Sequence, residues 1–280
     1  MTDKAAAAPP LEEQVLHRIA DGVSWITLNR PESANAISYQ QRNHVINLLA
    51  TASADYAIRA VVLTSSGSKH FCTGADLRAA QPEITRPADA PDMPSGHVSR
   101  NIRIGAQRLV AAILDCEKPV IGAINGTAAG IGAHMAFACD LVIAADTAKF
   151  IEVFVRRGIA PDGGGAYLLP RIIGLQKTKE LMFFGDELPV EEAHRLGLVN
   201  AVVPGEDLQR TAAEWAARLA SGPTRAISLT KWLVNRSLDS DRAGAFYDES
   251  YAQELIMHTE DANEGVSAFV ERRDPTYKGW

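Results

Sequence analysis

The 280-residue chain contains few cysteines, and they are not arranged to bind a metal. Cys72, Cys116 and Cys139 form no CxxC pair and no cluster with histidine. No zinc or other metal site is therefore expected, and so few thiols suit a reducing compartment. Cys116 and Cys139 stand in apolar surroundings, where cysteine usually serves as a small buried hydrophobic residue.

Long apolar runs and a basic excess are also absent. No run of about 18 uncharged apolar residues is present, so no membrane-spanning helix is expected. The first residues, MTDKAAAAPPLEEQ, lack the apolar centre of a signal peptide, so we expect residues 1–13 to be a disordered lead and the protein to be cytoplasmic. The formal net charge of −6 argues against general nucleic-acid binding.

Three common nucleotide and nucleophile motifs are missing. No P-loop pattern and no G-x-S-x-G nucleophile elbow occur. The segment GIGAHM begins like a dinucleotide fingerprint, but Met135 stands where the last glycine is required. These absences argue against a P-loop nucleotidase, an α/β-hydrolase and a Rossmann dehydrogenase.

The patterning that is present predicts an α/β core followed by helices. Residues 14–30 alternate around Asp21-Gly22, as in a β-hairpin, and helical spacing follows from Ser38, a plausible N-cap, to Ala52. Further strands are predicted at 60–66, 118–125 and 141–146, with helices at 100–116 and 130–140. After about residue 175 the pattern is nearly all helical, with helices predicted at 189–198, 208–221, 223–238, 242–258 and 260–273.

Residues 78–96 interrupt this pattern. The segment is rich in proline, alanine and aspartate and has no periodicity. We therefore predict a mobile surface loop there, and a lid over a binding site is one possible role.

Two glycine-containing turns follow predicted strands, at 70–78 (HFCTGADLR) and 125–136 (NGTAAGIGAHMA). Strand ends are where ligands usually bind in α/β folds, and small residues let a ligand approach the backbone. Unpaired N–H groups from two such turns can stabilise a developing oxyanion. The alternative is that the glycines only allow tight packing between elements.

A third segment, GIAPDGGGAYLLPR, places Asp162 between a proline and three glycines. An aspartate in this context is ordinary turn chemistry, because its side chain caps nearby amides. The local sequence alone therefore favours a turn residue over an acid–base residue.

Several segments together resemble the enoyl-CoA hydratase/isomerase (crotonase) superfamily. They are ITLNRPESANAIS, HFCTGADL, AINGTAAGIGAHMAFACDLVIAAD, FFGDELPVEEAHRLGLVNAVVP and EGVSAFVERRDPTYKG. The resemblance extends from about Gln14 to Lys278. It implies an α/β fold with a ββα spiral core at 14–205 and a C-terminal helical trimerisation region at 206–280. It also implies an acyl-CoA thioester substrate, no separate cofactor, and a homotrimer or dimer of trimers.

The resemblance also implies site residues. The two oxyanion amides fall on Ala75 and on Ile131, where the family typically has glycine. Substrate-binding positions fall on Gly74, Asp76, Gly130 and Phe154. Arg78 and Lys278 fall where the family often contacts CoA phosphates, although solvated surface charge is an equal alternative for both.

The chain departs from hydratases of this family at the catalytic positions. The two glutamates that position and split water match His134 and Phe154 here, and Glu152 is two residues from the expected place. The PDGGG turn instead matches the place where dienoyl-CoA isomerases and the PaaG-like ring-epoxide (1,2-epoxyphenylacetyl-CoA) isomerases carry a catalytic aspartate. The resemblance to the second group is the greater, and it raises Asp162 from a turn residue to a catalytic one.

We therefore predict an acyl-CoA isomerase in which Asp162 shuttles a proton and an oxyanion-stabilised enolate forms. His134 shares a helix face with Ile131 and is predicted as a second polar group near the acyl chain; a hydrogen-bonded core histidine is the alternative. Two other hypotheses stay open. One is a hydratase that uses Asp162 and His134, and the other is a family member that binds acyl-CoA without catalysis.

Overall fold

We describe the fold from a computed structural model that covers residues 9–79, 87–91 and 93–280. Ten strands form two sheets in this part of the chain. The larger sheet has the order β1-β2-β3-β5-β7-β10, and the smaller has the order β4-β6-β8-β9. The larger sheet contains β1 Val15–Ala20, β2 Val23–Leu28, β3 Ala60–Ser65, β5 Val120–Ile124, β7 Leu141–Ala145 and β10 Ala201–Val203. The smaller contains β4 His70–Cys72, β6 Thr127–Ala129, β8 Lys149–Ile151 and β9 Glu187–Pro189.

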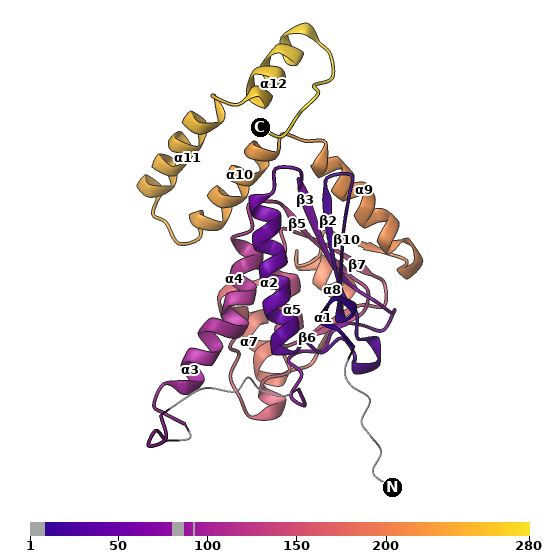
Figure 1. The fold of residues 1–280 in the computed structure, drawn as a ribbon, viewed down its shortest axis with the longest axis vertical. Helices are drawn as coiled ribbons and strands as arrows, with labels where there is room; N and C mark the ends of the chain where they lie inside the picture. The colour runs from indigo at the N-terminus through magenta and orange to yellow at the C-terminus, as the bar shows by residue number, and fades with distance from the viewer. Residues whose placement is uncertain (1–8, 80–86, 92) are drawn as a thin grey trace.

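The two sheets are built by a repeated ββα unit. β3, β5 and β7 enter the larger sheet in parallel, and the strand after each of them, β4, β6 or β8, enters the smaller sheet, also in parallel. The helices that follow return the chain for the next unit, so the core is a spiral (Figure 1). The core helices are α2 Tyr39–Ala54, α3 His97–Ile102, α4 Arg108–Leu114, α5 Ile131–Ala138, α6 Gly165–Ile173, α7 Leu175–Phe184, α8 Val190–Arg195 and α9 Leu208–Ala220. The predicted α/β class with a ββα spiral is confirmed.

Local signals account for the first elements. β1 and β2 pair antiparallel around Asp21 and Gly22, as the hairpin pattern predicts. Ser38 caps α2 in a full capping box, in which its side chain accepts from the Gln41 N–H and the Gln41 side chain accepts from the Ser38 N–H. Both predictions are confirmed.

The structure corrects three expectations. Residues 11–13 are not disordered but begin helix α1 (Leu11–Gln14), because Pro10 precedes it and Glu12 and Glu13 occupy its first turn. The helix predicted at 100–116 starts earlier, at His97, and a π-helical turn at Arg103–Gln107 joins α3 to α4. The region after residue 175 contains the strands β9 and β10, which are too short to give a periodic signal.

Two predicted segments fall partly outside the described residues. They are residues 1–8 of the predicted lead, and residues 80–86 and 92 of the predicted loop at 78–96. The described remainder of that loop contains no helix or strand before α3.

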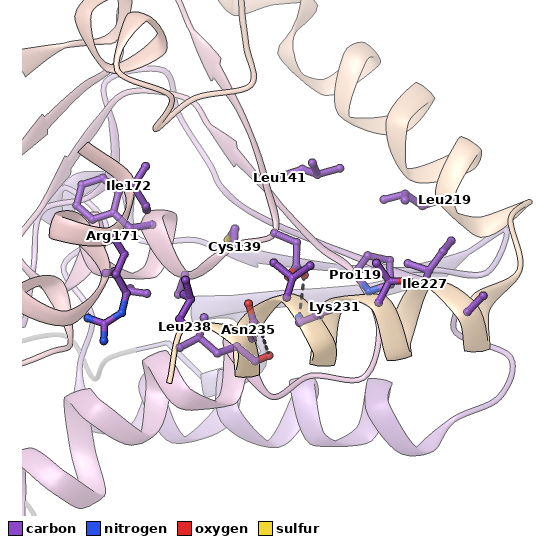
Figure 2. Close-up of a pocket in the computed structure, with 18 residues that line it drawn as sticks. Pro119, Cys139, Leu141, Arg171, Ile172, Leu219, Ile227, Lys231, Asn235 and Leu238 are labelled. Carbon is purple, nitrogen blue, oxygen red and sulfur yellow. Dashed lines mark hydrogen bonds and ion pairs between the residues drawn. The ribbon is translucent and has the colours of Figure 1, made fainter. Parts of the chain in front are cut away.

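Helices α10 Thr224–Ser237, α11 Arg242–Ile256 and α12 Glu260–Glu271 follow the core. α11 and α12 project away from the two sheets (Figure 1). A cavity of about 490 Å³ lies between α10 and the core (Figure 2). Beside it Lys231 of α10 pairs with Asp140 at 2.8 Å and donates to the Ile113 carbonyl at 2.9 Å. α10 is thus fixed to the core, while α11 and α12 pack mainly beyond it.

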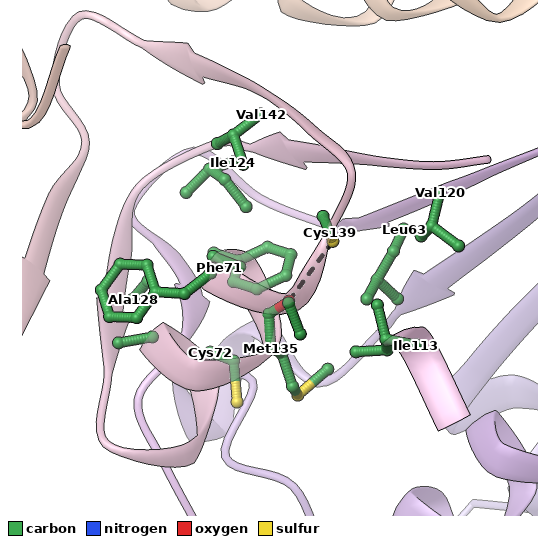
Figure 3. Packing of buried hydrophobic residues seen from close by; sticks show 14 of the residues in the cluster. Leu63, Phe71, Cys72, Ile113, Val120, Ile124, Ala128, Met135, Cys139 and Val142 are labelled. Carbon is green, nitrogen blue, oxygen red and sulfur yellow. Dashed lines mark hydrogen bonds between the residues drawn. The ribbon is translucent and has the colours of Figure 1, made fainter. Parts of the chain in front are cut away.

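The main hydrophobic core lies between the two sheets and helices α2, α4 and α5. Phe71 of β4 lies at its centre and is fully buried, with Leu63 and Met135 close by (Figure 3). A second cluster joins α9 to the opposite face of the larger sheet, where Leu208 and Ala212 pack with Val62 and Ile143. Burial of side chains of this size stabilises a fold by about 1.5–3 kcal/mol each. This packing fixes the strand ends from which the candidate site is built.

Candidate active site

A cavity of about 190 Å³ gathers most of the predicted site residues. It lies where β4 ends, α5 begins and the loop before α6 passes. Six predicted residues line it, namely Gly74, Ala75, Gly130, Ile131, Phe154 and Asp162. Most of its other lining residues are apolar or small, so much of the wall offers apolar contact to a ligand.

Two backbone amides at this cavity have no acceptor within the described part of the chain. The N–H of Ala75 lies between two backbone bonds that do form, from Ile37 to the Gly74 carbonyl and from Asp76 to the Ile37 carbonyl. Ile131 is the first residue of α5, where an N–H has no intrahelical partner. Gly130 precedes it with φ 53° and ψ −124°, a conformation that favours glycine and starts the helix at the cavity. Both amides are therefore free to donate to a ligand oxygen.

Asp162 is the only carboxylate among the described residues that line this cavity. It is partly buried, in the turn that leads into α6. Burial raises the pKa of its carboxyl above the ordinary value, and the nearby His134 charge opposes that rise. The turn and acid–base interpretations of Asp162 are compatible, because the turn holds the carboxyl at the cavity wall.

His134 lies behind the cavity wall, in the second turn of α5. It is fully buried and does not line the cavity. Its Nε2 is 3.2 Å from each carboxylate oxygen of Glu152, which is also buried. Its ring stacks on Phe154 with centroids 5.2 Å apart, and its Nδ1 is buried without a hydrogen-bond partner.

The pairing of His134 with Glu152 is the feature that sequence reasoning missed. The two residues are 18 positions apart and belong to different elements, since Glu152 directly follows β8. A buried histidine and a buried carboxylate in separate segments give no periodic signal. The only hint was that Glu152 departs from the apolar residues around it.

The remaining predicted residues lie outside this cavity. Asp76 and Arg78 line an adjoining hollow of about 300 Å³ that shares Ala75 and Arg157 with the cavity. Arg30 holds Asp76 at 2.9 Å; although burial raises the pKa of Asp76, this arginine and nearby amides lower it overall. Lys278 lines neither space and pairs with Glu260 at 3.0 Å.

Two arginines were not predicted but do line the cavity: Arg42 from α2 and Arg157 from the short helix at Val155–Arg157. They add positive charge beside the two amides. Burial lowers the pKa of Arg42, and its Nε is buried without a partner. No sequence signal distinguished these arginines from other surface charges.

Among the described residues near the cavity, we find neither an activated thiol nor a cluster of metal ligands. Burial raises the pKa of the Cys72 thiol to about 11, so the cysteine close to Gly74 is not a ready nucleophile. Across the described residues, no group of three or more His, Cys, Asp or Glu side chains is placed to hold a metal ion. The described helices also include none that is long and apolar enough to cross a membrane.

Comparison with known proteins identifies the family to which this fold and cavity belong. The family model for enoyl-CoA hydratase/isomerase matches residues 18–280. The chain therefore belongs to the enoyl-CoA hydratase/isomerase family.

Individual relatives have both kinds of activity in their names. The chain is 37% identical to 1,2-epoxyphenylacetyl-CoA isomerase from Escherichia coli, over 95% of this chain and 99% of that protein. It is 33% identical to a short-chain-enoyl-CoA hydratase from Clostridium acetobutylicum, over 90% and 92% of the two chains. The crystal structure of an enoyl-CoA hydratase from Bacillus anthracis superposes with a TM-score of 0.85 at 33% identity, covering 95% of this chain and 100% of that one. These matches establish the family, whose named relatives include both an isomerase and a hydratase.

Proposed function

We propose that the protein is an acyl-CoA isomerase in which Asp162 is the acid–base residue. The observation that carries this proposal is the composition of the cavity wall. Two free amides, from Ala75 and Ile131, share it with one carboxylate, Asp162. The position that family hydratases fill with a second glutamate holds Phe154, whose ring stacks on His134.

The proposed reaction needs one base and one oxyanion site. The thioester oxygen of the substrate accepts hydrogen bonds from Ala75 and Ile131. Asp162 takes a proton from a carbon of the acyl chain, and the electrons of that C–H bond move to the thioester oxygen to give an enolate. Asp162 then returns the proton to a different carbon, so the double bond shifts and no water is consumed.

The environment of Asp162 suits this role. A carboxyl group with an ordinary pKa is a weak base toward a carbon acid, and burial raises the pKa of Asp162 toward the working range. The apolar wall also keeps water from quenching the enolate. Gly74, Gly130 and Phe154 would bound the acyl chain.

The CoA portion of the substrate needs positive charge outside the acyl cavity. Arg78 and Arg157 line the adjoining hollow, and in this proposal they would contact the CoA phosphates. Lys278 was predicted for the same task, but within this chain it is engaged by Glu260. We assign the phosphate contact to the two arginines first.

The exposed apolar side chains of α11 and α12 support self-association. Phe246, Tyr247, Tyr251, Val266 and Phe269 are all exposed in the single chain. Apolar patches of this kind usually mark an interface. We propose that a second copy of the chain covers them, in a homotrimer or a dimer of trimers.

The test is a substrate panel run in labelled water. Unsaturated acyl-CoAs, including 3-enoyl and ring-derived thioesters, are incubated with the enzyme in oxygen-18 water and separated by chromatography and mass. An isomer without added oxygen is the expected product. A labelled hydroxyacyl product would replace the isomerase by the hydratase alternative, and tight thioester binding without any product would leave a non-catalytic binder.

A further inference from the structure

The buried pair of His134 and Glu152 has no role in the reaction as proposed so far. Both side chains are almost completely inaccessible, and Nε2 of His134 lies 3.2 Å from Oε1 and from Oε2 of Glu152. Burying a charged carboxylate is costly unless a counter-charge accompanies it. A pair in this place therefore needs to be neutral as a whole.

Neutrality determines where the protons of the pair lie. Either a Glu152 carboxylate faces a doubly protonated imidazolium, or a Glu152 carboxylic acid donates to Nε2 of a neutral imidazole. The other neutral arrangement, in which a Glu152 acid accepts from Nε2–H, is disfavoured because it leaves the buried acid hydroxyl without an acceptor among the described residues. In the first two arrangements Nδ1 of His134 carries a hydrogen. A bare Nδ1 together with a carboxylate would leave a net buried negative charge. Nδ1–H is thus a donor, and in the described structure it has no acceptor.

The glycines of the PDGGG turn leave the space that this imidazole occupies. A Cβ atom on Gly165 would come within 2.1 Å of Nε2 of His134, and one on Gly163 within 2.8 Å of Nδ1. Phe154 stacks on the ring, and its plane is tilted only 17° from the imidazole plane. The ring is therefore held in one orientation, with Nε2 toward Glu152 and Nδ1 toward Gly163, the residue next to Asp162.

We propose that Glu152, His134 and Asp162 form one acid–base relay, in which a Glu152 carboxylate holds His134 as an imidazolium and the Nδ1–H of this imidazolium stabilises the Asp162 carboxylate. His134 does not line the cavity, so it and Glu152 are positioning residues and Asp162 alone meets the substrate. This inference rests on the proposed role of Asp162. In this proposal His134, Gly163 and Gly165 share one function, because the two glycines leave room for the imidazole that acts on Asp162.

The relay reconciles the apolar surroundings of Asp162 with its need to be ionised as a base. An apolar cavity favours the protonated carboxyl, which cannot accept a proton from the substrate. Burial raises the pKa of Asp162, and the charge of His134 acts in the opposite direction. Arg42 from α2 and Arg157 are the other charged side chains that line the cavity. The charge of His134 thus favours the ionised form of Asp162 and opposes the effect of burial.

The first experiment reads the protons of the pair directly. Long-range proton–nitrogen NMR of the nitrogen-15-labelled protein near neutral pH distinguishes a protonated Nδ1 from one with a bare lone pair. The His134 signal is assigned by its absence in His134→Gln, since the chain has seven histidines. We expect both ring nitrogens of His134 to be protonated in the unaltered protein and only one of them in Glu152→Gln. A bare Nδ1 in the unaltered protein would overturn the relay.

The second experiment asks whether the pair acts on Asp162. We expect the acid limb of the pH–rate profile to move to higher pH by about one unit or more in both His134→Gln and Glu152→Gln, because Asp162 loses a neighbouring positive charge. A matched control is Glu254→Gln, which breaks the exposed pair of His258 and Glu254 (3.4 Å) and should leave the profile unchanged. Unshifted acid limbs in both test variants would refute the relay, even if their rates fell.

Two further measurements keep the relay and the proposed function separable. If either single variant fails to fold, the double variant Glu152→Gln/His134→Gln pairs two neutral amides, and the same upward shift is expected. If Asp162→Asn keeps full activity, the proposed function fails, while the NMR result still reports on the pair. A bare Nδ1 with an essential Asp162 would refute only the relay.

Discussion

The spiral core and the helices α10–α12 differ in where their large apolar side chains lie. In the core, strands such as β3 and β5 are buried along their whole length, and Phe71 has no exposed surface. In α12 the opposite holds, since Phe269 is 84% exposed and Val270 is 73% exposed. The core therefore contains its own hydrophobic partners, whereas the C-terminal helices display apolar surface that this chain leaves uncovered.

This difference separates two tasks within one chain. The candidate active site depends on strand ends and helix starts in the core, where the packing fixes backbone amides such as those of Ala75 and Ile131. The C-terminal helices contribute no residue to that cavity in the described structure. In our proposal their apolar face serves assembly rather than catalysis.

The largest effect should come from emptying the core. Phe71→Ala removes a fully buried ring, and we expect the free energy of unfolding to fall by about 3–5 kcal/mol in urea titrations. Phe269→Ala is the matched control, and it should change the stability of the dissociated chain by no more than about 0.5 kcal/mol. Equal losses would remove the contrast between the two regions.

A substitution in α12 should instead weaken assembly. Phe269→Asp places a charge on the proposed contact face, and we expect a loss of association free energy of about 2 kcal/mol or more, as for an interface anchor. Sedimentation velocity at several protein concentrations measures the shift toward monomer. Ile19→Asp, on the exposed face of β1, should leave the assembly intact. A protein that is monomeric without any substitution would contradict the proposed role of α11 and α12.

A tight contact inside the core gives a smaller effect on stability. In Gly132→Ala, the new Cβ would lie 2.1 Å from the carbonyl oxygen of Cys72. Both atoms are fixed to the main chain, so the contact is relieved only if the backbone moves. We expect a loss of about 1–3 kcal/mol in the free energy of unfolding. Gly205→Ala is the control, because its nearest neighbour would be 3.9 Å away. An unchanged Gly132→Ala protein would show that α5 can shift away from β4.

The smallest effect concerns the loss of folding stability caused by the partly buried Asp162 carboxylate. Burial raises the pKa of Asp162 above its ordinary value of 3.8. At a pH above that value, keeping Asp162 ionised therefore lowers the free energy of unfolding. Asp162→Asn should therefore increase the free energy of unfolding at neutral pH, by less than about 1 kcal/mol because solvent screens a half-exposed group. The gain should disappear as the pH falls below the ordinary pKa. Urea titrations at acid and neutral pH measure it, and a destabilised variant at neutral pH would contradict this reading.

The sequence predicted those elements that carry a strong local signal. The hairpin at Asp21-Gly22 and the capped helix at Ser38 were predicted from turn and cap chemistry alone. The three-residue strands β4, β6 and β8 were not predicted, because they are too short to show a two-residue period. The repeated ββα unit is consequently a property of the tertiary structure that the residue pattern hides.

The candidate site was predictable to a similar degree. The glycine turns indicated where backbone amides are free, and the family resemblance pointed to Asp162. The pairing of His134 with Glu152 and the cavity positions of Arg42 and Arg157 could not be predicted, since they depend on how distant segments pack. The need for Gly165 likewise becomes clear only once the imidazole lies against it.

The most direct test of the account is deuterium uptake by a bound acyl-CoA in deuterium oxide, compared between the unaltered protein and Asp162→Asn. We predict uptake at the carbon to which Asp162 returns the proton, and a loss of about 100-fold to 10,000-fold in the rate of uptake in Asp162→Asn with thioester binding retained. Uptake that is unchanged in Asp162→Asn would contradict the central claim and return Asp162 to the role of a turn residue.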